Sequence, residues 1–508
     1  MTDTMSEDRV PPINLSPSQF REMGHRLIDQ IADLLGSLPA RPVTPGRLPT
    51  EIQKTLNATA PLPEKGTDPQ ALLDRAFALL SENSLYNGHP RFWGYITASA
   101  APLGILGDCL AAAINPNVGA WKLSPMATEM EAQAIRWIAE LIGYPADCGG
   151  VMVSGGNMAN FVGFLAARAA KAGQAIRTAG GSSDIGRGLR VYSSKEGHTW
   201  IQKAADLFGL GTDAIRWIAP DSEQRIDLDE LEREIAKDKQ SGLRPFLVVG
   251  HAGTVSTGAI DPLPQLAALC RAHDVWFHVD GAYGGLAASV PGVSPDIRGL
   301  AEADSVAVDP HKWLYQPLEA GCALVRRPEA LRNAFSYHPP YYRFDDEAIN
   351  YVDYGLQNSR GFRALKVWLT LQQAGREGYM RMIGDDIALS REMHDCLARD
   401  PEIEVFTQKL SITTFRYVPK DRRATIGEPD TEVFLNKLNE DLLGHLQDGG
   451  EAFVSNAVLD GRYVMRACIV NFRTTRADVR ALPEIVTRLG RESDRRLRSG
   501  IHAPESTG

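Results

Sequence analysis

The sequence predicts an α/β fold with a mainly parallel central sheet. Beyond about residue 150, short apolar runs alternate with amphipathic segments of helix length. This alternation is typical of a parallel sheet whose faces are covered by helices. The chain has 508 residues, more than one hydrophobic core usually serves, so we expect more than one domain. The predicted strands are "VMV" at 151, "LRVYS" at 189, "FLVVG" at 246, "VWFHV" at 275 and "SVAV" at 305.

The predicted organisation is an N-terminal helical segment, a large sheet domain and a smaller C-terminal domain. We place these at residues 1–90, 91–378 and 379–508. Past about residue 380 the chain becomes more charged, and "FRYVPKDRRATIGEPD" is typical of a loop. The later "RYVMRACIVNF" predicts a strand, so we expect the C-terminal part to be an α+β domain.

The first predicted helix has a clear start signal. Ser16 is the expected N-cap, Pro17 the first helical residue, and Gln19 completes a capping box. Apolar residues from Phe20 to Leu35 then form one stripe. The following "PARPVTPGRLP" is too rich in proline for regular structure, so the helix is tethered. Its apolar stripe needs a surface, either on a second subunit or on its own chain.

Composition and charge argue against several classes of partner. Lys and Arg number 54 against 63 Asp and Glu, and the net charge of −9 disfavours nucleic acid and anionic membranes and favours small molecules. No apolar run reaches the ~18 residues of a membrane span. The first residues, "MTDTMSEDRV", lack the apolar region of a secretory signal. Six cysteines are scattered without a C-x-x-C pair, as expected of reduced thiols in a cytoplasmic enzyme.

A glycine-containing turn follows the first predicted strand, in "VMVSGGNMANFVGFLAAR". Ser154, Gly155, Gly156 and Asn157 precede a helix whose N-terminus favours negative charge. The glycines let backbone N–H groups approach an anion, so we expect a phosphate here. A tight turn without a ligand is the alternative. The pattern is neither the Rossmann G-x-G-x-x-G nor a P-loop.

Two further segments carry titratable side chains beside predicted strands. In "VWFHVDGAYGG", His278 and Asp280 lie on one face, and Asp280 ends the strand. Such a pair suits a metal, but no third ligand is nearby in the sequence, so no metal is expected. Asp280 as a cap of the next segment is the alternative. "SSKEGHTW" places His198 before a helix, where an isolated histidine is usually a surface or core residue.

The last predicted strand leads into "SVAVDPHKWLYQP", where Pro310 cannot continue the ladder. Lys312 follows, between His311 and Trp313. Taken alone, it would be a solvated lysine. A phosphate turn, an acid, an imidazole and a lysine at neighbouring strand ends together match the needs of pyridoxal 5'-phosphate. The lysine forms the Schiff base, the acid holds the ring nitrogen protonated, and the imidazole stacks on the ring.

The order "SGGNMAN", "EGHTW", "HVDGAYGG", "DPHKW" and "RACIVNF" resembles the pyridoxal-phosphate-dependent group II amino acid decarboxylases, over about residues 16–489. The resemblance implies an aspartate aminotransferase-like fold (PLP fold type I), with the active site at the interface of a homodimer. It implies that Lys312 binds the cofactor covalently, that Asp280 partners the pyridine nitrogen and that His198 lies over the ring. It assigns Ser154, Gly155, Gly156, Asn157 and His311 to the phosphate and Ala282 to the position under the ring.

Two positions depart from the family's pattern. Asp309 stands where the family often has asparagine, and a phosphate contact is not expected there because two anions would face each other. Where the family has "GTT", this chain has Thr254 followed by Val255. Only Thr254 is therefore carried over as a cofactor-binding residue.

The resemblance implies decarboxylation of an L-amino acid to the amine and carbon dioxide. Arg466 aligns with an arginine that faces the substrate carboxylate in relatives, and a surface ion pair is the alternative. "GHPRFWGYITASAAP", with Tyr95 and Ile96, falls where relatives line the side-chain pocket. Tyr95 favours an aromatic substrate, whereas "HPRF" resembles the branch that acts on acidic amino acids such as glutamate, aspartate or sulfinoalanine. An aldehyde synthase or an aminotransferase would use the same cofactor set.

The loop "SYHPPYYRFDDEAINYVDYGLQNSR" carries the remaining catalytic candidate. A loop of this kind can close over a site and exclude water. In the resembling decarboxylases a tyrosine on a mobile loop here protonates the carbanion left after carbon dioxide departs, and phenylalanine is associated with aldehyde-forming relatives. Tyr341 and Tyr342 both fit this role, and we choose Tyr342 as the proton donor.

Overall fold

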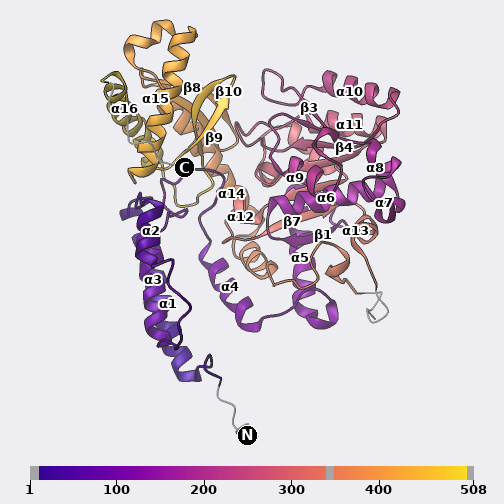
Figure 1. Cartoon of the computed structure of the whole chain (residues 1–508), viewed down its shortest axis with the longest axis horizontal. Helices are drawn as coiled ribbons and strands as arrows, with labels where there is room; N and C mark the ends of the chain where they lie inside the picture. The colour runs from indigo at the N-terminus through magenta and orange to yellow at the C-terminus, as the bar shows by residue number, and fades with distance from the viewer. Residues whose placement is uncertain (1–10, 339–347, 500–508) are drawn as a thin grey trace.

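The computed structural model describes residues 11–338 and 348–499. Among these residues, a seven-stranded sheet has the order β1-β7-β6-β5-β4-β2-β3 (Figure 1). The pairs β3–β2, β2–β4, β4–β5 and β5–β6 are parallel, and β7 runs antiparallel between β1 and β6. The predicted mainly parallel sheet is therefore confirmed. The strands are β1 (Gly149–Val153), β2 (Leu189–Ser194), β3 (Ile215–Ile218), β4 (Arg244–His251), β5 (Trp276–Asp280), β6 (Ser305–Val308) and β7 (Gly321–Val325).

The five predicted strands correspond to β1, β2, β4, β5 and β6. The sequence pattern did not indicate β3, since "IRWI" is short and its two central residues are partly exposed. It also passed over β7, although "GCALV" is a fully buried apolar run. Because β7 returns antiparallel to β6, it needs no crossover helix and does not repeat the strand–helix alternation on which the prediction rested.

Helices cover both faces of the sheet, since every residue of β5 and β6 is buried. α6 lies across the middle of the sheet, and α10 and α11 pack on β4. The helices of this part are α5 (Pro125–Ile142), α6 (Gly156–Ala172), α7 (Ala175–Ala179), α8 (Asp184–Gly188), α9 (Trp200–Leu207), α10 (Leu228–Gln240), α11 (Leu263–His273), α12 (Pro310–Trp313), α13 (Pro328–Phe335) and α14 (Ala364–Ala398).

The C-terminal part forms a smaller α+β domain, as predicted. Its antiparallel sheet has the order β10-β11-β9-β8 among the described residues, and α15 and α16 pack on it (Figure 1). The predicted strand in "RYVMRACIVNF" is β11. The elements are β8 (Ile403–Lys409), β9 (Ile412–Tyr417), α15 (Pro429–Asp448), β10 (Ser455–Leu459), β11 (Arg462–Cys468) and α16 (Arg476–Arg498).

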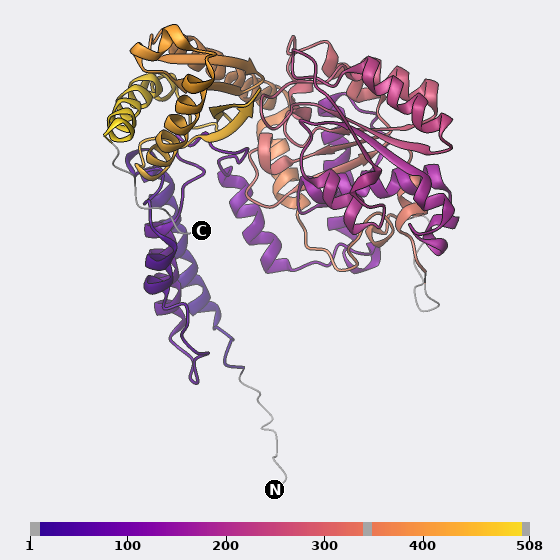
Figure 2. The same ribbon diagram turned by 45° about the horizontal axis from the view of Figure 1, so that its top comes forward.

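The first three helices form an arm that projects from the rest of the chain (Figure 2). The predicted capping box is present: the N–H of Gln19 donates to Ser16 Oγ at 3.3 Å, and the N–H of Ser16 donates to Gln19 Oε1 at 3.0 Å. No residue of α1 is buried within the described chain, and Phe20 is 66% exposed. The arm comprises α1 (Pro17–Ser37), α2 (Pro49–Leu56) and α3 (Pro69–Asn83), and α4 (Pro102–Ile114) follows it.

The proline-rich tether after α1 is irregular, as predicted, but it is anchored at its middle. Val43 is fully buried, its N–H donates to the carbonyl of Gly450 at 2.8 Å, and its own carbonyl accepts from the N–H of Tyr86 at 2.9 Å. Val43 shares a small apolar cluster with Phe92 and Phe453, whose rings stack 5.3 Å apart. The arm is therefore attached to the small domain through the tether, while α1 itself stays exposed.

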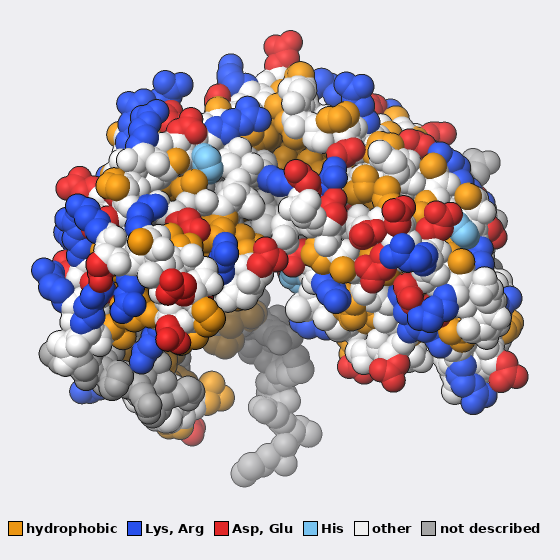
Figure 3. Space-filling view, turned by 90° about the horizontal axis from the view of Figure 1, so that it is seen from above, with side chains coloured by type: hydrophobic (Ala, Val, Ile, Leu, Met, Phe, Trp, Pro, Cys, Tyr) orange, Lys and Arg blue, Asp and Glu red, His pale blue; other side chains and the backbone are white. Residues whose placement is uncertain are grey.

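The surface carries both signs of charge. On the face shown in Figure 3, acidic and basic side chains are interspersed over both lobes, and the face is notched between the lobes. Within residues 11–338 and 348–499, no helix has the length and apolar character needed to cross a membrane.

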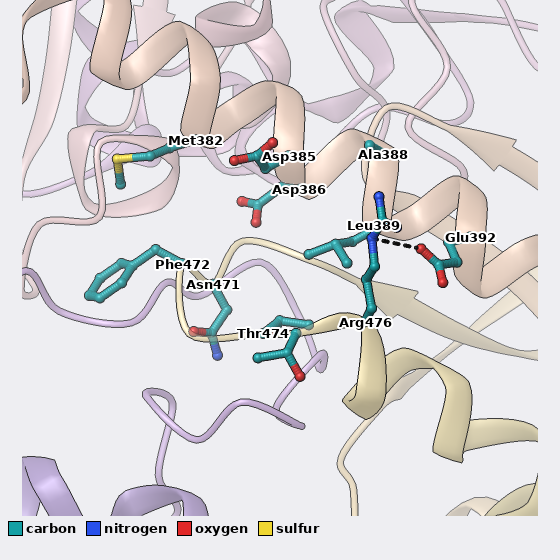
Figure 4. A pocket seen from close by; sticks show the side chains of 11 residues that line it. Met382, Asp385, Asp386, Ala388, Leu389, Glu392, Asn471, Phe472, Thr474 and Arg476 are labelled. Atoms are coloured by element: carbon teal, nitrogen blue, oxygen red, sulfur yellow. Dashed lines mark ion pairs between the residues drawn. The ribbon is translucent and has the colours of Figure 1, made fainter.

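α14 joins the large and small domains and bears a buried carboxyl group. The helix is kinked at Gly375, whose φ of +65° is unfavourable for residues with a side chain. About three helical turns beyond the kink, Asp386 Oδ2 accepts hydrogen bonds from Trp313 Nε1 at 2.9 Å and from Tyr315 Oη at 2.8 Å. Asp386 lines a cavity of about 290 Å³ together with Asn471 (Figure 4). Burial raises the pKa of the Asp386 carboxyl to about 7.

The pKa of Asp386 predicts how stability changes with pH. Because the folded-state pKa is about 7 and the ordinary value is 3.8, the folded protein holds a proton that the unfolded chain releases between these values. The contribution of this group is fully present below the ordinary value and is lost as the pH rises through about 7, at up to about 1.4 kcal/mol per pH unit. The melting temperature of the wild type should therefore fall relative to that of Asp386→Asn as the pH is raised through this window. Glu377→Gln, which changes an exposed carboxyl group on the same helix, should follow the wild type; parallel curves for wild type and Asp386→Asn would contradict the assignment.

Candidate functional site

The predicted site residues gather at one edge of the central sheet. β4, β5 and β6 end there, and the turn between β1 and α6 lies beside them. Parallel strands place their carboxyl ends on the same edge, which is where open α/β sheets bind ligands. A cavity of about 150 Å³ opens at this edge. The predicted residues that line it are Ile96, Gly156, Asn157, His198, Thr254, Asp280, Ala282, His311 and Lys312.

Asp280 is a buried carboxylate at the end of β5. The indole N–H of Trp200 donates to its Oδ2 at 2.8 Å, and the backbone N–H of Ala282 donates to its Oδ1 at 3.1 Å. Burial alone would raise the pKa of Asp280, but the nearby His251 and Lys312 and the Ala282 N–H together lower it below its usual value. Asp280 is therefore ionised and able to accept a hydrogen bond from a protonated group of a ligand.

Lys312 lies on α12, a single helical turn that follows β6. Its Nζ is 3.1 Å from Asp309 Oδ2, and His311 Nε2 is 3.5 Å from the same oxygen. His311 Nδ1 accepts the N–H of Ala320 at 3.1 Å, so in the neutral imidazole the proton is on Nε2 and points toward Asp309. Burial lowers the pKa of His311. Asp309, which departs from the family's pattern, is thus the ionic partner of the lysine.

The glycine turn brings backbone close to α12. A Cβ added to Gly156 would lie 2.7 Å from Asp309 Oδ2 and 3.2 Å from the Cβ of Ala282, so a side chain does not fit there. α6 begins at Gly156, and the first N–H groups of a helix have no partner within it. The N-terminus of this helix therefore presents N–H groups and a positive dipole end to an anion.

Trp200 positions two of the predicted residues. Its backbone N–H donates to His198 Nδ1 at 3.2 Å, while its indole N–H binds Asp280. Burial lowers the pKa of His198, so its imidazole is neutral near neutral pH and carries the proton on Nε2. The first residue of α9 thus fixes the tautomer of the imidazole and the orientation of the carboxylate at once.

The predicted substrate-binding residues meet beside the cavity. Arg466 on β11 is 3% exposed, and its Nη1 donates to Ser455 Oγ at 2.9 Å. Its Nε and Nη2 have no hydrogen-bond partner among the described residues. The N–H of Tyr95 donates to the same Ser455 hydroxyl at 3.3 Å. Ile96 lines the cavity, whereas Arg466 and Tyr95 are not among the residues that line it in the single chain.

Other predicted residues have different positions. Ser154 and Gly155 precede the helix and are not among the lining residues. The hydroxyl of Thr254 lies 3.1 Å from that of Thr257 and accepts the N–H of Ala259 at 3.1 Å, which orders the loop after β4. Tyr341 and Tyr342 lie outside the described residues.

His278 is part of the core. Its Nε2 donates to Asn160 Oδ1 at 2.7 Å, and its Nδ1 accepts from Ser305 Oγ at 2.7 Å. Burial lowers the pKa of His278 to about 4, so the ring is neutral. In the part of the chain that the structure describes, no group of three or more His, Cys, Asp or Glu side chains is placed to hold a metal ion.

Sequence reasoning did not single out several lining residues. His251, Asn160 and Tyr283 line the cavity beside the predicted groups. His251 is the last residue of β4. It could have been found by the same reasoning as Asp280, because both stand at the end of a predicted strand. Asn160 and Tyr283 lie one turn into a helix and inside a glycine-rich segment, where no local pattern marks them.

The residues present fit pyridoxal phosphate. An ionised carboxylate at Asp280 suits a protonated ring nitrogen, and a helix N-terminus suits a phosphate. Lys312 supplies the primary amine that an aldehyde requires. Ala282 and the imidazole of His198 line the same cavity, where a small side chain and a flat imidazole suit the faces of a planar ring.

Comparisons with known proteins agree with this chemistry. Residues 49–418 match the family model of the pyridoxal-dependent decarboxylase conserved domain. An aromatic-L-amino-acid decarboxylase of Bacillus atrophaeus is 33% identical over 469 residues, which is 91% of this chain and 94% of the relative. A phenylacetaldehyde synthase of Arabidopsis thaliana is 30% identical over 468 residues, 90% of this chain and 92% of the relative. The crystal structure of Oryza sativa TDC with PLP and tryptamine has a TM-score of 0.86 and 27% identity, and covers 95% of this chain and 99% of its own.

The position of Lys312 predicts covalent attachment of the cofactor. Borohydride reduction followed by peptide mass spectrometry should place the cofactor on Lys312 in the wild type, because this amine points into the cavity from α12. Lys312→Ala should lose the adduct and lose turnover by orders of magnitude, while Lys203→Ala, which changes an exposed lysine, should keep both. Cofactor that borohydride still fixes to the Lys312→Ala variant would contradict the assignment of Lys312 as the attachment site.

Proposed function

Because the chain belongs to the pyridoxal-dependent decarboxylase family, we propose that it decarboxylates an aromatic L-amino acid to the corresponding amine. The observation that carries the proposal is the pairing, at one sheet edge, of an ionised acid at Asp280 with an amine at Lys312. Bound pyridoxal phosphate supplies an electron-accepting ring, which is effective only while its nitrogen is protonated. Asp280 maintains that protonation, since its carboxylate faces the cavity.

The other residues orient the reactants and handle protons. Lys312 must give up a proton before its amine can attack an aldehyde, and Asp309 Oδ2 at 3.1 Å is placed to receive it. His198 presents Nε2–H to the cavity, where it can donate to a bound carboxylate or ring substituent. The mutual position of these groups around one cavity supports a reaction in which the bond to the substrate's carboxyl carbon breaks.

Arg466 is our candidate for the substrate carboxylate. Two of its nitrogens are buried without a partner, and leaving such donors unpaired costs free energy. A carboxylate would satisfy both, because the guanidinium fork matches its two oxygens. Ser455 holds Nη1 on the other side and also binds the backbone of Tyr95, so the arginine and the predicted side-chain pocket are connected.

The proposed substrate is aromatic rather than acidic. The relatives that act on aromatic amino acids support this, together with the apolar Ile96, Val255 and Tyr283 on the cavity wall. Among the described residues that line the cavity, Lys312 is the one lysine or arginine, and it is committed to the cofactor. An acidic side chain would therefore lack a permanent cation of its own.

An aldehyde synthase is the second candidate, because a phenylacetaldehyde synthase is among the relatives. The two reactions differ after loss of carbon dioxide: protonation at the α-carbon leads to the amine, whereas oxidation by molecular oxygen and hydrolysis by water lead to the aldehyde, ammonia and hydrogen peroxide. We assign the protonation to Tyr342, which lies outside the described residues. The amine is the proposed product because this chain carries tyrosine at both candidate positions.

A panel of amino acids tests substrate and product together. We expect carbon dioxide release and amine from L-tryptophan, L-tyrosine or L-phenylalanine, and much less from glutamate, aspartate or cysteine sulfinate. Tyr342→Phe should slow amine formation and shift the product toward aldehyde and ammonia in air, whereas Tyr341→Phe, its matched control, should not. Rapid turnover of an acidic amino acid would overturn the substrate assignment, and unchanged amine formation by both variants would overturn the role of the loop.

We also propose that the enzyme is a cytoplasmic homodimer with the active site at the subunit interface. All six cysteines are free thiols, which suits a reducing compartment. Exposed apolar side chains on the arm and on α4 support the dimer, since monomers rarely leave such a surface in water. They include Phe20 at 66%, Leu80 at 66% and Ile114 at 69% exposure.

Removing α1 tests the dimer. Deletion of residues 1–37 leaves the anchored Val43 in place, so it removes the exposed helix without disturbing the small domain. Sedimentation should show a monomer or aggregate for this variant and a dimer for the full chain. The full-length variant Phe20→Asp should also sediment as a monomer or aggregate, because a charge would be buried at the subunit contact. A stable, active dimer in both variants would refute the role of α1.

A further inference from the structure

His251 is a buried imidazole that the reaction outlined above does not use. It is 3% exposed and lines the cavity. Its Nε2 is buried without a hydrogen-bond partner among the described residues. Buried polar atoms are nearly always paired. An unpaired ring nitrogen on the wall of a cofactor cavity therefore calls for an explanation.

The other side of the ring is firmly held. Asp261 Oδ2 lies 3.0 Å from His251 Nδ1 and accepts the backbone N–H of His251 at 2.8 Å. Asp261 is fully buried, and its Oδ1 accepts the N–H of Ile226 at 2.8 Å. The carboxylate therefore requires a proton on Nδ1, which fixes the orientation of the imidazole and leaves Nε2 on the cavity side.

The sheet places this imidazole next to Asp280. His251 and Asp280 are register partners on the parallel strands β4 and β5, so their side chains leave the same face of the sheet. The N–H of Ala252 donates to the carbonyl of Asp280 at 3.0 Å and locks this register. The direct hydrogen bonds to the Asp280 carboxylate come from Trp200 and Ala282, both neutral donors.

The charges around His251 favour the imidazolium. Burial alone would lower the pKa of His251, but Asp261, Asp280 and Glu196 together raise it above the ordinary value. The other titratable groups that face this pair are Lys312, whose charge also lowers the pKa of Asp280, and the imidazoles of His198 and His278, whose pKa values are lowered by burial. A positive charge on His251 in turn is the largest of the neighbouring influences that lower the pKa of Asp280.

We propose that His251, held by Asp261, is a positioning residue that keeps Asp280 ionised and aimed at the ring nitrogen of the cofactor. The three side chains form a buried row of alternating charge, Asp261 negative, His251 positive and Asp280 negative, and the protonated ring nitrogen extends it. The row acts on cofactor binding and is independent of which amino acid is the substrate.

A double-mutant cycle on cofactor affinity tests the row. His251→Asn keeps a donor toward Asp261 and removes Nε2 with its charge. In holoenzyme dialysed against graded pyridoxal phosphate, His251→Asn should raise the Kd about tenfold, the scale of 1.4 kcal/mol. In an Asp280→Asn background the same change should raise it less than about twofold, because the partner of the charge is gone. His89→Asn, at a buried histidine outside the cavity, should leave the Kd unchanged.

The pH dependence separates a charge from a packing role. The ratio of the Kd of His251→Asn to that of the wild type should fall toward one as the pH rises, since the imidazolium loses its proton. If His251→Asn does not fold, Asp261→Asn takes its place in the cycle, with the same expected coupling to Asp280. Equal Kd effects in both Asp280 backgrounds, or a Kd ratio that does not change with pH, would overturn the proposal. Neither outcome depends on the identity of the substrate.

Discussion

Asp280 is an ionised group in a place that water barely reaches, and burying a carboxylate is costly unless hydrogen bonds and opposite charges compensate for its lost hydration. The compensation comes from several elements of the fold. α9 contributes the indole of Trp200, the segment after β5 contributes a backbone N–H, and α12 contributes Lys312. The elements that meet at this edge of the sheet therefore supply the hydrogen bonds and the positive charge that stabilise the buried carboxylate.

The residues next to the site also connect the two domains. Tyr283 stacks on Trp313 with ring centroids 4.8 Å apart, and its hydroxyl lies 2.7 Å from that of Ser411 in the small domain. Trp313, which follows Lys312 in the chain, donates to Asp386 on α14. A change in the relative position of the domains would therefore displace Lys312, because the rigid aromatic side chains of Tyr283 and Trp313 connect it to the small domain and to α14. The hydrogen bonds of these buried polar groups fix the relative position of the domains more specifically than apolar packing alone would.

Much of the fold could be predicted from local pattern. The strands β1, β2, β4, β5 and β6 and the capping box at Ser16 follow from contiguous residues, because periodicity and capping act over a few positions. β3 and β7 were not predicted. β3 is short and partly exposed, and β7 breaks the strand–helix alternation. Lys312 and Asp280 could be predicted as cofactor-binding candidates because residues at the carboxyl ends of parallel strands meet at one edge of the sheet. The unpaired nitrogens of Arg466 have no local signal, as their surroundings come from β10 and the segment around Tyr95.

The residue types at the strand ends, and with them the cofactor and the class of reaction, could be inferred from the amino-acid sequence, because strand ends and turns are encoded in neighbouring residues. Which of these groups meet is set by the folded chain. His251 and Asp280 are 29 positions apart and become neighbours through the β4–β5 register, while Asp386 lies 73 positions from Trp313 and reaches it through the packing of α14. Contacts of this kind depend on register and domain docking, which are set by the burial of whole faces rather than by any local pattern.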